Sequence, residues 1–241
     1  MSLNIWGGHV QEPLLAFMKS QQDVDIFCLQ EVYDQATFKN STDDRSVSLN
    51  ILSEFKTPLP NHTAYFRPVV NGVYGIGMLV KKDIEVVDEG EIVIHDNPNY
   101  PGMGPTHSRN LQWLQCKNQD TIISVCNVHG LWNGQGKTDT PERLNQSKII
   151  KAFLATLNTP KIVCGDFNLR PDTQSLQIIA EGMDNLISRF NISSTRSSLY
   201  EKPEKFADYV FTSKDITIHS FTAMDTVVSD HLPLIIDFTL D

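Results

Sequence analysis

Acids, amides and imidazoles follow apolar stretches of this chain at the points where β-strands would end. Residues 162–165 are apolar, for example, and Asp166 and Asn168 come directly after them. A single polar residue in such a place usually belongs to a turn and bonds the neighbouring backbone. The same arrangement recurs, however, at Asn4, Glu31, His129, Asp208, Asp230 and His231. Because core strands seldom end in polar groups this often, we predict that these strand ends converge on one site.

The types of these residues indicate the chemistry of the site. Carboxylate and amide oxygens dominate, and hard oxygen ligands favour Mg²⁺, or Mn²⁺ in its place, over zinc. Mg²⁺ keeps several waters, so one or two protein carboxylates suffice to hold it and substrate phosphate fills further positions. A carboxylate near the metal can take a proton from an attacking water, and histidines can donate to phosphoryl oxygens. The combination is typical of metal-assisted phosphoester hydrolysis.

The stretch KIVCGDFNLRPD, residues 161–172, predicts how part of the site is built. If the strand continues as far as Asn168, its alternation places Asp166 and Asn168 on one face and returns Phe167 to the core. Gly165 is expected to let the backbone and a phosphate approach each other closely.

Strand-like and helix-like segments alternate along the chain, and these elements must position the polar residues. Apolar residues at helical spacing predict helices over 10–22, 44–59, 141–158 and 173–182. Apolar or alternating runs predict strands over 3–6, 23–32, 62–69, 74–82, 84–95, 109–129 (as a hairpin), 161–168, 206–213, 216–224 and 231–240. Thr140 and Pro141 have the side chains expected at the start of the third helix. The pattern predicts an α/β fold in which two β-sheets pack face to face with helices outside, as a single domain over residues 1–241.

The composition limits the classes of function. With 241 residues, of which 40% are hydrophobic, the chain can bury a sizeable core. Its net charge of −9 argues against a general nucleic-acid coat protein, which needs a basic face, but does not exclude a nuclease. The four cysteines each adjoin an apolar run and are predicted to be buried, reduced thiols. Because the sequence has no signal peptide or membrane-spanning run, we predict a cytoplasmic protein without a transmembrane segment, and a monomer.

Six motifs, taken in order, carry a family resemblance. They are LNIW, LQEV, NVHGLW, GDFNLRPD, FADYVF and SDHLPL. Together they resemble the endonuclease/exonuclease/phosphatase superfamily, whose members include the deoxyribonuclease-I-like nucleases, and the resemblance extends from Asn4 to about Phe238. It implies a four-layer α/β sandwich, with two mixed sheets face to face, helices on the outside and the site at one end of the sheets.

The resemblance also implies a set of metal ligands. Glu31 is similar to the principal Mg²⁺ ligand of the family, and Asn4 would lie close to the metal. Asp230 resembles a residue that helps the metal or its hydrogen-bond network.

The remaining motif residues resemble those that act on the substrate. Asp166 would orient or deprotonate the attacking water, and Asn168 would contact the phosphate. His231 would stabilise the phosphoryl oxygens, with Asp208 fixing the tautomer of its imidazole. His129 matches the branch of the family that has a histidine at this position, where it assists the leaving group.

Substrate choice is expected to reside in loops at the rim of the site, over residues 95–108 and 130–142. Arg109 follows the first loop and is predicted to bind substrate phosphate, with a surface or salt-bridge role as the alternative. We find no aromatic and arginine stripe of the kind that grips single-stranded nucleic acid. Trp6, Tyr74 and Trp132 are interpreted as packing residues, with contact to the substrate as the alternative.

The predicted function is therefore a Mg²⁺-dependent phosphoester hydrolase, more specifically a phosphodiesterase. Its partner is a phosphoester substrate, and nucleic acid, a phospholipid and a small molecule all remain candidates. The alternative is a catalytically idle family member that binds a phosphorylated or protein partner. Idle members usually lack a metal-binding or water-activating residue, and because this chain retains them all, the enzyme is favoured.

Overall fold

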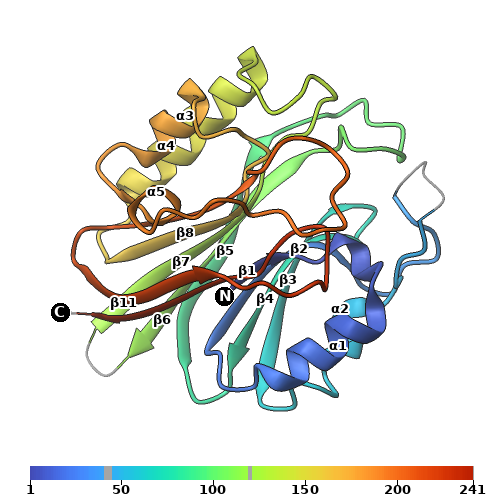
Figure 1. Ribbon diagram of the computed structural model, residues 1–241, viewed down its shortest axis with the longest axis horizontal. Helices are drawn as coiled ribbons and strands as arrows, with labels where there is room; N and C mark the ends of the chain where they lie inside the picture. The colour runs from blue at the N-terminus through green and yellow to red at the C-terminus, as the bar shows by residue number, and fades with distance from the viewer. Residues whose placement is uncertain (41–44, 119–120, 241) are drawn as a thin grey trace.

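Two β-sheets lie face to face in the computed structural model, which describes residues 1–40, 45–118 and 121–240 (Figure 1). The first sheet has the strand order β11-β12-β1-β2-β4-β3. Its strands are β1 (Ser2–Asn4), β2 (Ile26–Tyr33), β3 (His62–Val70), β4 (Tyr74–Lys81), β11 (Ile216–Ala223) and β12 (Leu234–Leu240). The second sheet has the order β5-β6-β7-β8-β10-β9. Its strands are β5 (Glu85–His95), β6 (Arg109–Asn118), β7 (Thr121–His129), β8 (Lys161–Asp166), β9 (Asp184–Asn185) and β10 (Asp208–Thr212).

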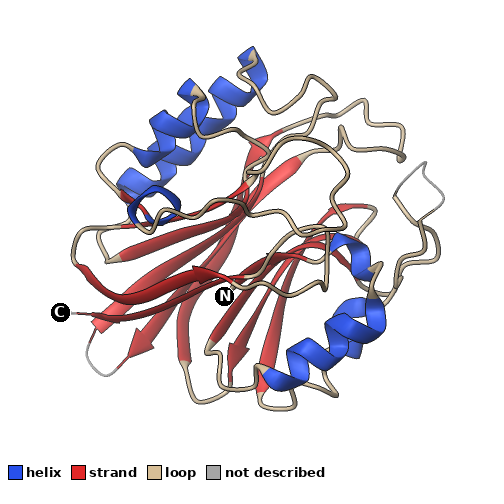
Figure 2. Cartoon of the chain, in the orientation of Figure 1, coloured by secondary structure: helices blue, strands red, loops and turns tan. Residues whose placement is uncertain are grey.

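Helices cover the outer face of each sheet, so the fold is the predicted four-layer α/β sandwich (Figure 2). The helices α1 (Gln11–Ser20) and α2 (Ile51–Glu54) lie outside the first sheet. The helices α3 (Pro141–Thr156), α4 (Gln174–Ala180) and α5 (Leu186–Arg189) lie outside the second. In the described part of the chain, none of these helices is long and apolar enough to cross a membrane.

The third predicted helix begins as its sequence indicates. The Thr140 side chain accepts a hydrogen bond from the backbone N–H of Arg143, and Pro141 occupies the first turn, where its missing N–H costs nothing. The helix predicted over 44–59 is mostly wrong, because only Ile51–Glu54 is helical. Instead, Ser48 donates its backbone N–H to the carbonyl of Gly7, which holds the preceding segment against another part of the chain. Residue 44 and the predicted hairpin tip at 119–120 lie outside the described residues.

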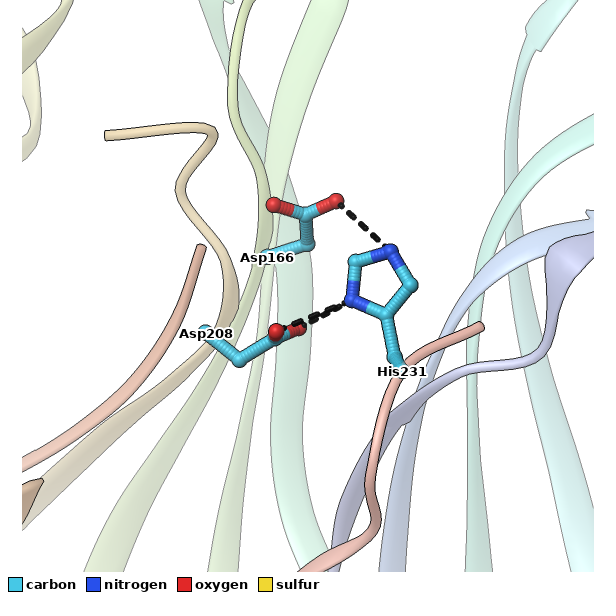
Figure 3. A group of neighbouring side chains, drawn as sticks. All are labelled: Asp166, Asp208 and His231. Atoms are coloured by element: carbon cyan, nitrogen blue, oxygen red, sulfur yellow. Dashed lines mark hydrogen bonds and ion pairs between the residues drawn. The ribbon is translucent and has the colours of Figure 1, made fainter. Parts of the chain in front are cut away.

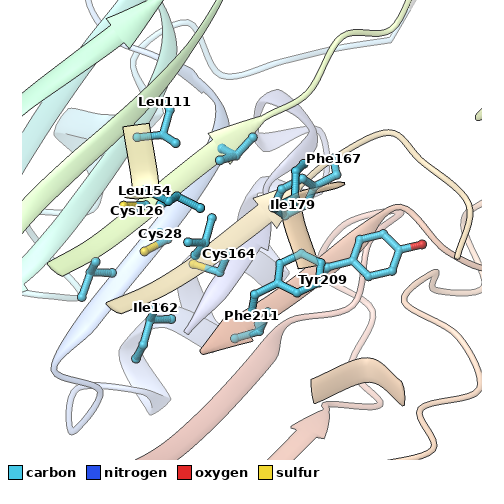
Figure 4. Packing of buried hydrophobic residues seen from close by; sticks show 14 of the residues in the cluster. Cys28, Leu111, Cys126, Leu154, Ile162, Cys164, Phe167, Ile179, Tyr209 and Phe211 are labelled. Atoms are coloured by element: carbon cyan, nitrogen blue, oxygen red, sulfur yellow. The ribbon is translucent and has the colours of Figure 1, made fainter. Parts of the chain in front are cut away.

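One large hydrophobic cluster of the core combines residues of both sheets with residues of α3, α4 and α5 (Figure 4). Phe167 is fully buried there, with its ring centroid 5.9 Å from that of Tyr209 and 5.5 Å from that of Phe211. The four cysteines are buried free thiols, as predicted. Cys28 and Cys164 come from different sheets and belong to the same apolar cluster, so each behaves as a small core residue.

The ends of two parallel strand pairs position the functional residues. Each sheet is otherwise antiparallel but has one parallel pair near its middle, β1 with β2 and β7 with β8. Parallel neighbours end on the same edge of a sheet, so Asn4 of β1 lies beside Gln30, and His129 of β7 lies opposite Asp166 of β8. Asp208, which begins β10, is also paired with Asp166. The two sheets therefore bring their polar strand ends to one end of the sandwich.

Candidate active site

A cleft of about 370 Å³ opens at this end of the sandwich. It is lined by seven of the nine residues proposed for the site: Glu31, Arg109, His129, Asp166, Asn168, Asp230 and His231. The other two, Asn4 and Asp208, bond directly to lining residues from behind. The fold thus brings together all nine residues, although their sequence positions run from 4 to 231.

Asn4 joins the carboxylates of the two sheets. Its Nδ2 donates to Glu31 Oε1 at 3.0 Å and to Asp166 Oδ2 at 3.1 Å. Its Oδ1 accepts from the backbone N–H of Trp6 at 2.9 Å, which fixes the orientation of the carboxamide. In this arrangement Asn4 organises the two carboxylates with its N–H groups.

Glu31 lies at an irregularity of β2. The pairing of β2 with β4 shifts between Leu29 and Val32, and Glu31 has a left-handed φ of 58°. Such bulges are common beside active sites because they redirect a side chain. Burial and the neighbouring Asp230 raise the pKa of Glu31, whereas the hydrogen bond from Asn4 lowers it.

The donor set around Glu31 fits a hard divalent cation. Within the described residues, Glu31 accepts a hydrogen bond from Asn4 alone, and its second oxygen is left for another ligand. Its raised pKa shows that its negative charge is poorly compensated by the protein, with Asp230 close by. A cation with a preference for oxygen would relieve this repulsion.

His231 is held by Asp208 (Figure 3). Its Nδ1 lies 2.8 Å from Asp208 Oδ1 and 2.9 Å from Oδ2, so Nδ1 donates its proton and Nε2 faces the cleft. Thr195 Oγ1 donates to the same carboxylate at 2.8 Å. Burial and Arg196 lower the pKa of His231, but Asp208, Asp230 and Asp166 outweigh them and raise it overall. Arg196 Nη1, which can only donate, lies 2.5 Å from Nε2, so Nε2 accepts a hydrogen bond here. The raised pKa favours protonation of Nε2, and in that state Nε2 can donate.

Asp166, Asp208 and His231 also form a compact group whose potential ligand atoms all lie within 4.8 Å of one another. Both oxygens of Asp208 already accept hydrogen bonds, from His231 and Thr195. We therefore assign Asp208 to orienting the imidazole, and regard the carboxylates nearer Glu31 as the better ligands for a metal.

Asn168 reaches the site by a route different from the predicted one. β8 ends at Asp166, and Asn168 has a left-handed φ of 54°, so strand alternation does not place the two side chains on one face. Instead, the Asn168 backbone N–H donates to Asp166 Oδ1 at 2.8 Å. The explanation predicted for Gly165 is also wrong, because a Cβ there would lie 2.0 Å from the Val128 carbonyl oxygen of the neighbouring strand. It is the backbone of β7, rather than a phosphate, that requires glycine at 165.

Asp166 is buried yet remains ionised. Burial alone would raise its pKa, but the positive charges of His231, Lys137 and Arg196 hold the pKa below its usual range. Its Oδ2 lies 3.7 Å from His231 Nε2 and 4.0 Å from His129 Nε2. An ionised carboxylate at this point can accept a hydrogen bond from water at neutral pH.

His129 sits among groups that keep it neutral. Burial and the nearby Arg109 lower its pKa well below the usual value, more than Asp166 raises it. Its Nε2 is 4.0 Å from Glu31 Oε1, and its ring centroid is 6.2 Å from that of His107. A neutral imidazole in this position can donate a hydrogen bond to a leaving group.

Arg109 is a buried cation that has no carboxylate partner within residues 1–40, 45–118 and 121–240. Only 2% of the residue is exposed, and its Nη2 donates to the Pro105 carbonyl at 2.8 Å. Its Nε and Nη1 have no hydrogen-bond partner among the described residues. The surface role considered for Arg109 is therefore wrong. A buried guanidinium with two free donors at the edge of a cleft is well suited to an anion.

Several residues of the cleft escaped the sequence analysis. Arg196 Nη1 donates to Asp230 Oδ2 at 3.2 Å and also contacts His231 Nε2. Its guanidinium lies 4.0 Å from the ring centroid of Tyr200. Both residues come from the loop before β10, whose composition is that of an ordinary surface loop. No local signal marks them, because the loop reaches the site through tertiary contacts, among them the bridge between Arg196 and His231 and the hydrogen bond from Thr195 to Asp208.

The two predicted loops form part of the rim, which also includes Arg45, Tyr200 and Lys202 from other loops. Pro105 and His107 come from the first loop, and Trp132 and Lys137 from the second. Trp132 lines the cleft, and its ring has Lys137 Nζ at 5.8 Å from the centroid, so it is more than a packing residue.

Other residues considered near the motifs have mixed outcomes. Tyr74 both lines the cleft and packs, since it is 6% exposed and its ring lies 4.7 Å from that of Tyr33. Trp6 also lines the cleft. Arg170 is turned away and pairs with Asp172 at the surface.

Comparison with known proteins agrees with this geometry. The Endonuclease/Exonuclease/phosphatase family model matches residues 1–231. The chain belongs to this family. Comparison with curated protein sequences found no match.

Solved structures share the fold of this endonuclease/exonuclease/phosphatase chain. An endonuclease/exonuclease/phosphatase from Bacteroides vulgatus is 18% identical, with a TM-score of 0.76 over 100% of this chain and 97% of the other. A mannosyl-6-phosphatase from Bacteroides thetaiotaomicron is also 18% identical, with a TM-score of 0.76 over 99% and 98%. A humanized TDP2 from D. rerio is 15% identical, with a TM-score of 0.73 over 99% and 97%. At these identities the likeness concerns the fold, and neither activity nor substrate transfers with it.

Proposed function

We propose that this chain is a divalent-metal-dependent phosphodiesterase that uses Mg²⁺, or Mn²⁺ in its place. The proposal is carried by four features that meet in one cleft. They are a carboxylate with a raised pKa, an ionised aspartate, an Asp–His pair, and a buried arginine with two donors that have no partner among the described residues. These residues are Glu31, Asp166, Asp208 with His231, and Arg109. Family membership supports a phosphoester hydrolase.

The acidic side of the cleft would hold the metal and the water. Glu31 and Asp230 would be its carboxylate ligands, with Asn4 nearby to keep Glu31 in place. When bound, the metal would polarise a phosphoryl oxygen and offset the charge that develops on the phosphate. Asp166 would orient the attacking water, since it is ionised and its Oδ2 faces the two histidines.

The basic side of the cleft would hold the phosphate. Arg109 supplies its two free donors, and one N–H of the Asn168 carboxamide remains besides the one that donates to Gly130. His231, oriented by Asp208, would donate from Nε2 to an oxygen that gains charge in the transition state. His129 would donate a hydrogen bond to the leaving oxygen.

The idle alternative predicts binding without turnover. An idle site would be expected to have lost a ligand or the group that positions water. Here each such group is in place and oriented by a partner, as Asn4 orients Glu31 and Thr195 supports Asp208. This completeness favours an enzyme.

The proposal is tested by a panel of phosphoesters assayed with Mg²⁺, with Mn²⁺ and with EDTA. Bis(p-nitrophenyl) phosphate reports diester hydrolysis, and p-nitrophenyl phosphate reports monoester hydrolysis. Plasmid DNA, RNA, sphingomyelin and inositol phosphates cover the natural classes. We expect metal-dependent turnover that favours diesters and disappears in EDTA. Equal turnover in EDTA would contradict the metal dependence, and a preference for monoesters would contradict the diesterase assignment.

A further inference from the structure

Lys137 is a buried cation of the cleft to which the proposed reaction assigns no contact with the substrate. It is only 3% exposed, and burial lowers its pKa to about 8. Its Nζ donates to Asn168 Oδ1 at 3.1 Å, and it forms no ion pair within the described part of the chain. The carboxylates of Asp166, Asp208 and Asp230 act on this ammonium from beyond ion-pair distance, and they raise its pKa by less than burial lowers it. Its burial is therefore only partly compensated by opposite charge.

The chain holds this ammonium firmly at the cleft. The Lys137 carbonyl accepts a hydrogen bond from the backbone N–H of Arg170 at 2.9 Å, which ties the rim loop to the turn after β8. The same turn presents Asn168, whose Nδ2 donates to Gly130 at 3.2 Å. Two hydrogen bonds therefore position Lys137, one from its carbonyl to the backbone of Arg170 and one from its Nζ to the side chain of Asn168.

Aromatic rings and a second lysine surround Lys137. Its Nζ is 5.8 Å from the ring centroid of Trp132 and 5.9 Å from that of Tyr200. Lys202 Nζ lies 5.3 Å from the same Trp132 ring, and all four residues line the cleft. We call Trp132, Lys137, Tyr200 and Lys202 the lysine subsite. Flat rings beside two ammonium groups can contact both the uncharged body of a ligand and its anionic group.

The cleft has more positively charged groups than one phosphodiester needs, and the additional ones belong to the lysine subsite. A phosphodiester carries a single negative charge, and Arg109 has free donors for it. Arg196 is already paired with Asp230. Lys137 and Lys202 therefore remain as cations without an anionic partner among the described residues.

We propose that the lysine subsite binds a second anionic group, a phosphate carried by the same substrate molecule beside the ester that is hydrolysed. This inference rests on the proposed function, because it places the hydrolysed ester at Asp166 and His231. It narrows the substrate class to molecules with two phosphates close together, such as a bisphosphate or two successive phosphates of an oligonucleotide.

Binding of two nucleotide probes to the metal-free protein tests the subsite without relying on turnover. Calorimetry on the metal-free protein would compare thymidine 3′,5′-bisphosphate with thymidine 5′-monophosphate. We expect the wild-type protein to bind the bisphosphate at least about tenfold more tightly. Lys137→Met should abolish this preference and change the affinity for the monophosphate by less than about twofold. Lys137→Arg should retain part of the preference, because it keeps the charge.

Two further variants keep the test decisive. Lys148→Met removes a lysine from the exposed face of α3 and should leave the preference intact. Lys202→Met changes an exposed residue, so it should fold even if Lys137→Met does not, and should reduce the preference. The inference is overturned if the wild-type protein shows no preference, if Lys137→Met weakens both probes equally, or if Lys148→Met acts in the same way. A protein that prefers the bisphosphate but hydrolyses no ester would contradict the proposed function and leave the subsite standing.

Discussion

Asp166 and Asp208 are both buried beside His231, yet their surroundings prepare them for different tasks. Both oxygens of Asp208 accept hydrogen bonds from His231 and Thr195, so in the proposed reaction it would act through the imidazole. Asp166 is kept ionised by the surrounding cations, and its Oδ2 faces the two histidines. Two residues of one type thus acquire separate roles from their hydrogen bonds and neighbouring charges.

The buried histidines should make the fold sensitive to acid. Burial and Arg109 lower the pKa of His107 from 6.5 to about 2. Between these values the unfolded chain binds a proton that the folded chain does not, so stability is complete above pH 6.5 and falls as the pH decreases. We expect His107 to account for a loss of about 2 kcal/mol between pH 6.5 and pH 5, at about 1.4 kcal/mol per pH unit.

Urea unfolding at pH 7 and pH 5 measures this loss. His107→Gln should show a smaller decrease in unfolding free energy than the wild-type protein, because glutamine does not titrate. The exposed His219 provides the control, and His219→Gln should retain the wild-type decrease. Identical decreases in the His107→Gln and wild-type proteins would show that His107 is not held neutral by the fold.

Residue type and position at strand ends were enough to predict most of the candidate site. Glu31 and His231 could be named because an ionisable group that ends an apolar run is conspicuous. Arg196 could not, since its place beside Asp230 depends on how a long loop folds back over the sheets. Lys137 lies in the second predicted rim loop, but its burial is a property of the tertiary structure.

At the scale of elements, irregular backbone within and just after the strands does most to shape the site. β8 is followed by a left-handed residue at Asn168, and β2 contains another at Glu31. Strand periodicity predicts neither, because a bulge or a left-handed turn interrupts the alternation on which the prediction depends. The strands themselves, and α1 and α3, were predicted well because their apolar patterns are long. The helix predicted over 44–59 was mostly wrong, since only the short α2 is helical there.

Gly165 should be the most sensitive glycine of these strands. Its φ is 140°, and an added Cβ would lie 2.0 Å from the Val128 carbonyl oxygen, which belongs to the backbone and cannot rotate away. We expect Gly165→Ala to lower the unfolding free energy by about 3 kcal/mol, from backbone strain and overpacking together. Gly182 also has a positive φ, of 80°, but an added Cβ there would have no atom within 4 Å.

Chemical denaturation of Gly165→Ala and Gly182→Ala separates the cost of backbone strain from the cost of overpacking. Gly182→Ala should cost only the strain, about 1 kcal/mol. An equal cost in both variants would show that contact with β7 is not what requires glycine at 165.

For the whole molecule, two similar sheets are joined so that the ends of their parallel strand pairs meet. The net charge of −9 describes the outer surface and gives little indication of the cleft, where Arg45, Arg109, Lys137, Arg196 and Lys202 all contribute to the lining. Sequence patterns predicted the layers because periodicity reports which faces are buried. They could not predict this gathering of cations, since it depends on loops from distant parts of the chain. The monomeric state, the cytoplasmic location and the single-domain organisation stay predictions.

The measurement that tests the account most directly is the rate of bis(p-nitrophenyl) phosphate hydrolysis in Mg²⁺ by the wild-type protein and by Glu31→Gln. Glutamine keeps the size and the hydrogen bond from Asn4 but removes the charge that would hold the metal. We predict a fall in kcat/KM of at least about 100-fold, comparable to the loss of one strong electrostatic contact in a transition state. The exposed Glu201, changed to Gln, should leave the rate unchanged. A Glu31→Gln protein that hydrolyses the diester at the wild-type rate would contradict the assignment of this cleft as a metal-dependent phosphodiesterase site.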